Sequence, residues 1–270
     1  MSAQNLRWKT QIYFSRSYRH LKPNSKEQLF FLLWVVLPSL IIFLFFYTKI
    51  SYLLAVWIKE ALSLVIPVIS LGIGYGEFLP LFGGVYYVQI PSKMPSFQEV
   101  TTNLVVTLLL LFICFFLIKS SKRGTPLLIY FAIILLIHLV AGTYFMFAKD
   151  SYPYSATQYS ELYIQQQVGI WLSFLVLSGL ITGILGYGSL KGRLVVFFGT
   201  MAYSFIFGCV RYLVSIFIVS KASSLYMASL FFSLGPMFDF LYLVCFYSIY
   251  INQQIKRLGQ GEGRAMWHWL

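Results

Sequence analysis

Long apolar runs, interrupted by short polar segments, recur along the whole chain. The clearest runs are about 16 to 26 residues long, close to the length that a helix needs to cross the hydrocarbon core of a bilayer. The alternating ten-residue segments of a membrane β-barrel do not occur. The pattern therefore predicts an all-α, polytopic helical membrane bundle with six firm transmembrane helices, at 29–47, 103–118, 126–147, 168–187, 194–219 and 225–250.

The segments between these runs differ in character. Residues 77–101 hold three prolines and a Gly-Gly pair, and "GVYYVQI" within them is β-prone but too short to cross a membrane. We expect irregular structure here, with a hairpin. Residues 148–167 are rich in Tyr, Ser and Gln, whereas "KSSKRG" and "GSLKGR" are short and basic. The sequence thus predicts two outer segments, 77–101 and 148–167, within a transmembrane domain at 29–250.

Composition and charge support this interpretation and give it an orientation. The chain has 270 residues, of which 59% are hydrophobic and only 10% charged, against about 25% charged in soluble domains. Of its 20 Lys and Arg residues, fourteen fall in 1–28, in the two short basic segments and in the tail at 251–270. The positive-inside rule therefore predicts a cytoplasmic N-terminus and C-terminus and explains the charge of +12 without nucleic acid. Residues 1–28 are then a basic cytoplasmic or interfacial segment, 251–270 a cytoplasmic tail, and the location the inner (plasma) membrane.

Residues 51–76 are harder to interpret. They are apolar, but Lys59 and Glu60 are adjacent, and Pro67 and three glycines break the run. If 51–92 crosses the membrane twice, there are eight transmembrane helices; if it does not cross, there are six. We prefer six, because the paired charges and the Pro/Gly content suit an interfacial or re-entrant segment.

The chain lacks the usual motifs of soluble enzymes. It has no GxSxG, HExxH or P-loop pattern, and its three cysteines, Cys114, Cys209 and Cys245, lie in apolar runs without metal-ligand spacing. We interpret the cysteines as small hydrophobic residues. No catalytic residue, metal site or cofactor is predicted.

Three ionisable residues lie within the predicted spans. Arg211 is ten residues from Lys221, so about 15 Å from the end of its helix. Asp239 lies in the next span, and the short connection makes the two helices neighbours. We interpret the two as a buried ion pair that locks the helices together; a site that moves protons or binds substrate is the alternative. His138, in mid-span, is expected to hydrogen-bond a neighbouring helix, with a proton relay as the alternative.

The second outer segment carries an aromatic and amide-rich surface. Its tyrosines suit an interfacial belt, and a binding platform for a sugar or a partner protein is the alternative. The candidate partner-binding residues are Tyr152, Tyr154, Tyr159, Tyr163 and Gln165.

The layout resembles the exosortase/archaeosortase family of multi-pass membrane cysteine transpeptidases. The stretches "GGVYYVQIPSKMPSFQEVTTNLVVTLLLLF", "KRGTPLLIYFAIILLIHLVAG" and "IQQQVGIWLSFLVL" follow the family order over roughly 83–180, and "CVRYLV" with "FFSLGPMF" repeats its last parts. The family cysteine would fall in "PSFQEV", which has none, and the family histidine at Gln165 or Phe231. Only Arg211 could match the family arginine, and only in the repeated part of the layout, so the resemblance implies the fold and not the activity.

These observations lead to one expected function and two alternatives. We expect an integral inner-membrane protein that acts as a non-catalytic structural or assembly subunit of a membrane complex, in contact with lipid and other membrane proteins. The alternatives are an exosortase-type transpeptidase with a displaced site and a transporter or channel component.

Overall fold

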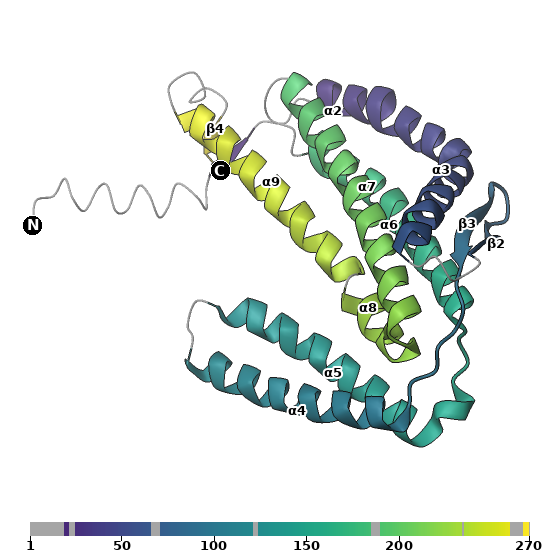
Figure 1. The fold of residues 1–270 in the computed structure, drawn as a ribbon. Helices are drawn as coiled ribbons and strands as arrows, with labels where there is room; N and C mark the ends of the chain where they lie inside the picture. Colours follow the sequence, from purple (N-terminus) through teal and green to yellow (C-terminus); the bar gives the residue numbers. More distant parts are fainter. Residues whose placement is uncertain are drawn as a thin grey trace, which may run out of the picture. The chain divides into compact units, whose positions relative to one another are not determined.

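A computed structural model describes residues 19–21, 25–65, 71–120, 124–184, 190–233, 235–259 and 267–269. The chain divides into two compact units, 1–38 with 176–200 and 243–270, and 39–175 with 201–242. We describe each unit by itself. Most of the described residues are helical (Figure 1). The elements are β1 (Arg19–Leu21), α2 (Ser25–Phe31), η1 (Leu32–Val36), α3 (Leu37–Val65), β2 (Gly72–Leu79), β3 (Gly83–Gln89), α4 (Phe97–Ser120), α5 (Thr125–Ala148), η2 (Lys149–Ser151), α6 (Ala156–Ile184), α7 (Leu190–Lys221), η3 (Ser224–Tyr226), α8 (Met227–Ser233), α9 (Pro236–Gly259) and β4 (Trp267–Trp269).

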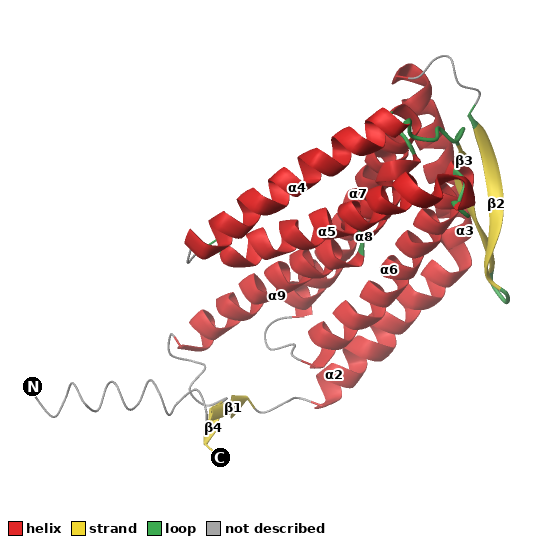
Figure 2. Ribbon diagram, turned by 90° about the horizontal axis from the view of Figure 1, so that it is seen from below, coloured by secondary structure: helices red, strands yellow, loops and turns green. Residues whose placement is uncertain are grey.

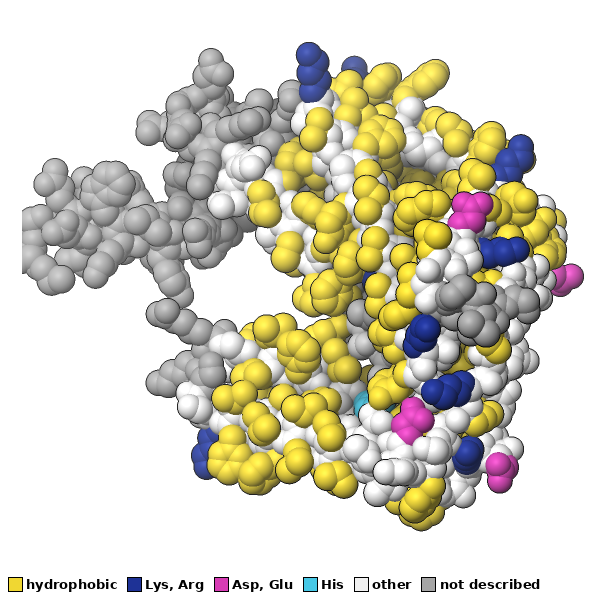
Figure 3. Space-filling model, in the orientation of Figure 1, with side chains coloured by type: hydrophobic (Ala, Val, Ile, Leu, Met, Phe, Trp, Pro, Cys, Tyr) yellow, Lys and Arg dark blue, Asp and Glu magenta, His cyan; other side chains and the backbone are white. Residues whose placement is uncertain are grey.

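Six helical stretches of the described chain are long and apolar enough to cross a membrane, as the hydropathy pattern predicts. Each contains one predicted span or most of it. They are Lys26–Val65, Phe97–Ser120, Thr125–Ser151, Ala156–Gly183, Leu190–Lys221 and Ser224–Gln253. Figure 3 shows hydrophobic side chains over most of the visible helical surface, with few charged side chains among them. The prediction of a mostly helical chain with six helices long and apolar enough to cross a membrane is therefore confirmed.

The boundaries differ from prediction at three places. Residues 51–65 form no separate segment, because the first helix continues through Lys59 and Glu60 to Val65. The predicted outer segment 77–101 is partly regular, with a hairpin from Gly72 and a helix from Phe97. Helix α6 begins at Ala156, so most of the predicted outer segment 148–167 is helical. Polar residues at the start of a long helix look like loop in a hydropathy pattern, which explains the last difference.

The second unit contains a β-hairpin whose inner strand is held by helix side chains. β2 and β3 are antiparallel, with Gly74 opposite Tyr87, and β2 is the outer strand (Figure 2). The N–H groups of β3 that point away from β2 are bonded by side chains. Val88 N–H donates to Tyr212 Oη at 3.0 Å, and Tyr86 N–H donates to Ser51 Oγ at 3.1 Å. The hairpin is thereby attached to α3 and α7, because unpaired backbone groups of an edge strand need partners.

The core of this unit lies where the hairpin, α3, α6 and α7 meet. It is rich in large aromatic side chains, and the rings of Tyr163 and Tyr212 are stacked with centroids 5.7 Å apart. Burial raises the pKa of the Tyr87 phenol in β3, and the neighbouring Glu161 carboxylate raises it further, so this buried hydroxyl is uncharged.

Helices α4 and α5 form an antiparallel pair in the second unit; α4 is anchored at one end, whereas α5 is also bonded to α8 through His138 and Tyr130. Val100, Phe145 and Leu225 pack together there. Two polar contacts fasten the same end: Ser223 Oγ donates to Glu99 at 2.7 Å, and Tyr226 donates to Asn103 at 2.8 Å. Beyond Thr107 on α4 and before Gly142 on α5, no described residue of the pair is buried.

The first unit is held by close helix packing and one ion pair. Gly179 and Gly183 are four residues apart on α6, and a Cβ at Gly179 would lie only 2.5 Å from Val36. Small residues at this spacing let membrane helices approach closely. Arg193, itself almost completely buried, donates to Glu27 at 3.1 Å.

Candidate functional site

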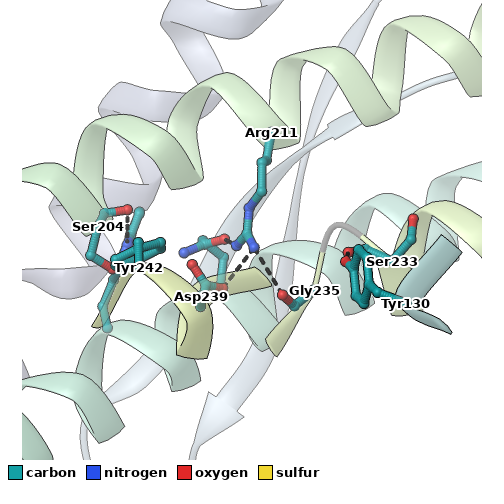
Figure 4. Close-up of polar contacts among 9 residues, drawn as sticks. Tyr130, Ser204, Arg211, Ser233, Gly235, Asp239 and Tyr242 are labelled. Carbon is teal, nitrogen blue, oxygen red and sulfur yellow. Dashed lines mark hydrogen bonds and ion pairs between the residues drawn. The ribbon is translucent and has the colours of Figure 1, made fainter. Parts of the chain in front are cut away.

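A break in the last apolar stretch creates the site. Pro236 lacks the N–H that would bond the carbonyl of Phe232, and its ring disfavours a continuous helix, so α8 ends at Ser233 and α9 begins at Pro236. The break exposes backbone carbonyl groups within a stretch apolar enough to span a membrane. Such groups need partners from elsewhere in the protein. Tyr130 Oη donates to the Ser233 carbonyl. The Gly235 carbonyl accepts the Phe238 N–H at 3.1 Å and a second hydrogen bond from Arg211 (Figure 4).

Arg211 joins this break to α6 and to its own helix, α7. Its Nη1 lies 2.6 Å from Asp239 Oδ2 and 3.1 Å from the Gly235 carbonyl oxygen. Its Nη2 donates to the side-chain carbonyl of Gln167 on α6. The guanidinium also lies over the Phe207 ring, 5.3 Å from the ring centroid. A guanidinium can fill this role because it carries five donors in a fixed plane.

Both charges of the pair are buried. Asp239 is 0% exposed and Arg211 is 3% exposed. Asp239 lies in the first turn of α9, where the partial positive charge of a helix N-terminus also favours a carboxylate. The predicted contact between Arg211 and Asp239 is therefore present in the structure. Arg211 and Asp239 lie side by side rather than at different depths along their two helices, because the break allows α9 to start beside Arg211.

Gln167 is the site residue that sequence analysis missed. It fell in the predicted outer segment, and the structure places it on α6, 1% exposed. Its amide fits against Gly208, where a Cβ would lie 2.5 Å from Gln167 Nε2. The spacing of Tyr159, Tyr163 and Gln167, four residues apart, is the signal that would have placed all three on one helical face.

A further pair of hydrogen bonds extends the site along α7. Tyr242 donates to Ser204 Oγ at 2.7 Å, and Trp171 Nε1 donates to the Ser204 carbonyl at 3.1 Å (Figure 4). Ser204 thus connects α6, α7 and the start of α9 next to the ion pair.

His138 lies apart from this site. Its Nδ1 is 3.0 Å from Ser229 Oγ on α8, and its ring stacks on Tyr226. This is the expected hydrogen bond to a neighbouring helix. His138 therefore joins α5 to the segment that leads into α8.

The candidate partner-binding residues separate into two groups. Tyr152 and Tyr154 lie in the short loop before α6 and line an apolar groove, whereas Tyr159 and Tyr163 are buried on α6. Gln165 donates to the Glu77 carbonyl of β2 at 2.9 Å. Only the first two of these tyrosines are in the loop that was expected to bind a partner. The others are internal because α6 begins at Ala156.

The thiols lie in apolar surroundings or at the surface. Cys209 lines a groove with Leu54 and Trp57, Cys114 is half-buried and Cys245 is exposed. In the described part of the chain, no three His, Cys, Asp or Glu side chains are grouped closely enough to hold a metal ion.

Comparison of the chain with protein-family models, curated proteins and solved structures finds no match. An arginine that is bonded to an aspartate, to a glutamine and to a helix break holds three helices together.

A double-mutant cycle tests whether the pair stabilises the fold. Arg211→Leu or Asp239→Leu leaves one buried charge without its partner, so each is expected to cost about 3–5 kcal/mol and to lower the amount of folded protein. The double variant is expected to cost less than the sum of the two. Thermal unfolding in detergent measures all four proteins. Additive losses would show that the two residues do not interact energetically.

Gly235→Ala tests the tight backbone at the break. A Cβ at Gly235 would lie 2.3 Å from the Phe231 carbonyl oxygen, a backbone atom that cannot move aside without disturbing α8. We expect a loss of about 1–3 kcal/mol. The matched control is Gly199→Ala on α7, where a Cβ would meet nothing within 4 Å and alanine favours the helix. Equal melting temperatures for the two variants would refute the steric argument.

Proposed function

We propose that the chain is a multi-pass inner-membrane protein with both termini in the cytoplasm, and that it acts as a non-catalytic structural or assembly subunit of a membrane complex. The observation that carries this proposal is the poorly covered α4–α5 pair. Two helices long enough to span a membrane bury almost nothing along most of their length. Helices of a self-sufficient bundle usually bury a stripe along their whole length.

Two apolar grooves lie along α5 and support the proposal. One, of about 640 Å³, is lined by Val140, Tyr144 and Phe232, among others. The second, of about 700 Å³, is lined by Ile129, Tyr130 and Phe240, among others. Membrane helices associate by interlocking their side chains with complementary surfaces. Grooves of this kind, one after the other along α5, suit the side chains of a partner helix.

The proposed site chemistry is structural rather than catalytic. Every strong contact of Arg211 is made with a group of the same unit, and three helices depend on those contacts. On the exosortase-like interpretation, the family histidine would fall at Gln165, which donates to the Glu77 carbonyl, or near Phe231, which packs against Tyr163. A degenerate member of that fold, retained for assembly, is consistent with these contacts.

The proposed topology can be tested by thiol labelling. In a variant without the three native cysteines, single cysteines at Ser120 and Ser189 are expected to be protected from a membrane-impermeant reagent in intact cells, because basic segments stay in the cytoplasm. A cysteine at Ser155 is expected to be labelled. Labelling of the first two positions but not the third would invert the topology.

The assembly role can be tested by filling one groove. Val140 is 67% exposed on α5 and lines the 640 Å³ groove, whereas Val195 is 71% exposed on α7 and is not among the residues that line either groove. We expect Val140→Trp to abolish the chains that co-purify stoichiometrically in gentle detergent, and Val195→Trp to leave them unchanged. Both variants should accumulate to wild-type levels. Absence of any stoichiometric partner with the wild-type protein would contradict the proposal.

A further inference from the structure

The turn that joins β2 to β3 is apolar and lies at the free end of the hairpin (Figure 2). Its residues Pro80, Leu81 and Phe82 are all exposed, Leu81 to 91%. Turns that face water are usually built from Gly, Asn, Asp, Ser and Pro, and not from Leu and Phe. At this exposure the Leu81 side chain packs against almost nothing in the protein. A group of exposed apolar side chains suits an apolar partner outside the chain.

The turn lies beside an exposed apolar part of α3. The rings of Phe82 and Phe45 are in edge contact, with centroids 6.2 Å apart. Phe45 is itself 69% exposed and belongs to the helical stretch Lys26–Val65, which is apolar enough to cross a membrane. Phe45 and the turn therefore form one continuous apolar surface. On the proposed membrane topology, which this inference assumes, Phe45 faces lipid, and so does the turn next to it.

The backbone of the turn has hydrogen-bond partners within the protein. Phe82 N–H donates to the Leu79 carbonyl at 3.0 Å, and Pro80 has no N–H that needs a partner. Tyr47 on α3 donates its hydroxyl to the Gly83 carbonyl at 2.6 Å. These groups therefore do not depend on water.

Gly84, the next residue, is bonded in the same way. Its carbonyl accepts a hydrogen bond from Thr48 Oγ1 at 3.0 Å, and its N–H donates to Tyr75 Oη at 2.8 Å. In a bilayer the protein itself must satisfy backbone polar groups, because hydrocarbon offers them no partners. The bonded groups at this end of the hairpin thus have the partners that contact with lipid requires.

A band of tyrosines and a lysine adjoins the apolar surface. On α3, Lys49 and Tyr52 lie about 6 Å and about 10 Å beyond Phe45 at 1.5 Å per residue. The Tyr52 ring centroid is 5.1 Å from that of Tyr86 on β3, which is 5.0 Å from that of Tyr75 on β2. Membrane proteins place Tyr and Lys at the boundary between lipid and water. The boundary is therefore expected between Phe45 and Tyr52.

Polar side chains limit how far the hairpin can enter a bilayer. Glu77 on β2 is exposed, and at about 3.3 Å per residue its Cα lies at most about 13 Å from that of Leu81. Gln89, at the other end of β3, is exposed as well. A carboxylate is costly in hydrocarbon. Only the turn can therefore lie among acyl chains, while the strands stay among the headgroups and in water.

We infer that residues 79–82 form a lipid anchor, in which the turn of the hairpin inserts shallowly into the bilayer beside Phe45. Its partner is the acyl chains of the surrounding lipid. The continuity of the turn with the exposed face of α3 and the adjoining tyrosines favour lipid over a partner protein. On the proposed topology, the leaflet that receives the turn is the outer one.

Fluorescence quenching from the lipid side tests the anchor. In the variant without native cysteines, Leu81→Cys and Gln89→Cys each carry a bimane label, and each protein is reconstituted in phosphatidylcholine vesicles that contain a lipid with a nitroxide on its acyl chain. The label at position 81 is expected to lose most of its fluorescence to the lipid quencher and little to iodide in the buffer. The label at position 89, about 20 Å further along the hairpin, is expected to show the reverse order.

Two results at position 81 would overturn the inference. Stronger quenching by iodide than by lipid would place the turn in water, and protection from both quenchers would show that protein covers it. Labelling of Gln89→Cys by a membrane-impermeant reagent in intact cells reports the topology separately. Failure of that labelling, together with strong lipid quenching at position 81, would contradict the proposed topology and not the insertion.

Thermal unfolding in lipid nanodiscs gives a second test. Because the Leu81 side chain packs against almost nothing in the protein, Leu81→Glu changes stability only through the surroundings of the turn. The variant is expected to melt about 2–4 °C below the wild type, since a carboxylate among acyl chains is costly. Gln89→Glu, at the polar end of the same hairpin, is the control and should melt with the wild type. A wild-type melting temperature for Leu81→Glu would overturn the inference.

Discussion

The contact between Arg211 and the α8–α9 break is the interaction on which the second unit depends. Pro236 interrupts the helix, and the interruption leaves carbonyl groups in an apolar stretch, where water is scarce. Arg211 binds the Gly235 carbonyl and Asp239 with one nitrogen and Gln167 with the other. One side chain thereby satisfies the break, neutralises the buried carboxylate and fixes α6 against α7. An arginine is costly within an apolar stretch, and these three contacts offset that cost.

The same constraint explains the placement of the neighbouring residues. Gln167 reaches the guanidinium because Gly208 leaves space for its amide, and Gly235 allows the chain to turn close to the end of α8. Ser204 then links Trp171 and Tyr242 beside the pair.

The lengths of the apolar runs in the sequence predict much of the fold, but the sequence predicts only part of the site. A continuous apolar run of 20 residues has few structural options in a protein of this composition, so the six helices were predictable. Arg211 and Asp239 were predictable as a pair because the turn between their runs is short. Gln167 was not, because a polar helix start resembles a loop until its spacing is considered. The continuation of α3 through Lys59 and Glu60 was also missed, since adjacent charges suggested an interruption that the helix does not need. At 1.5 Å per residue, this helix is longer than the bilayer core is thick. Charged side chains near one of its ends can therefore remain in water.

The central claim is that the planar, multiply donating guanidinium, and not positive charge alone, holds the break. Thermal unfolding of the Arg211→Lys protein in detergent tests it most directly. Lysine keeps the charge but offers a single nitrogen that cannot reach Asp239, Gly235 and Gln167 together. The account predicts a melting temperature well below that of wild type, close to that of Arg211→Leu. A wild-type melting temperature for Arg211→Lys would contradict it.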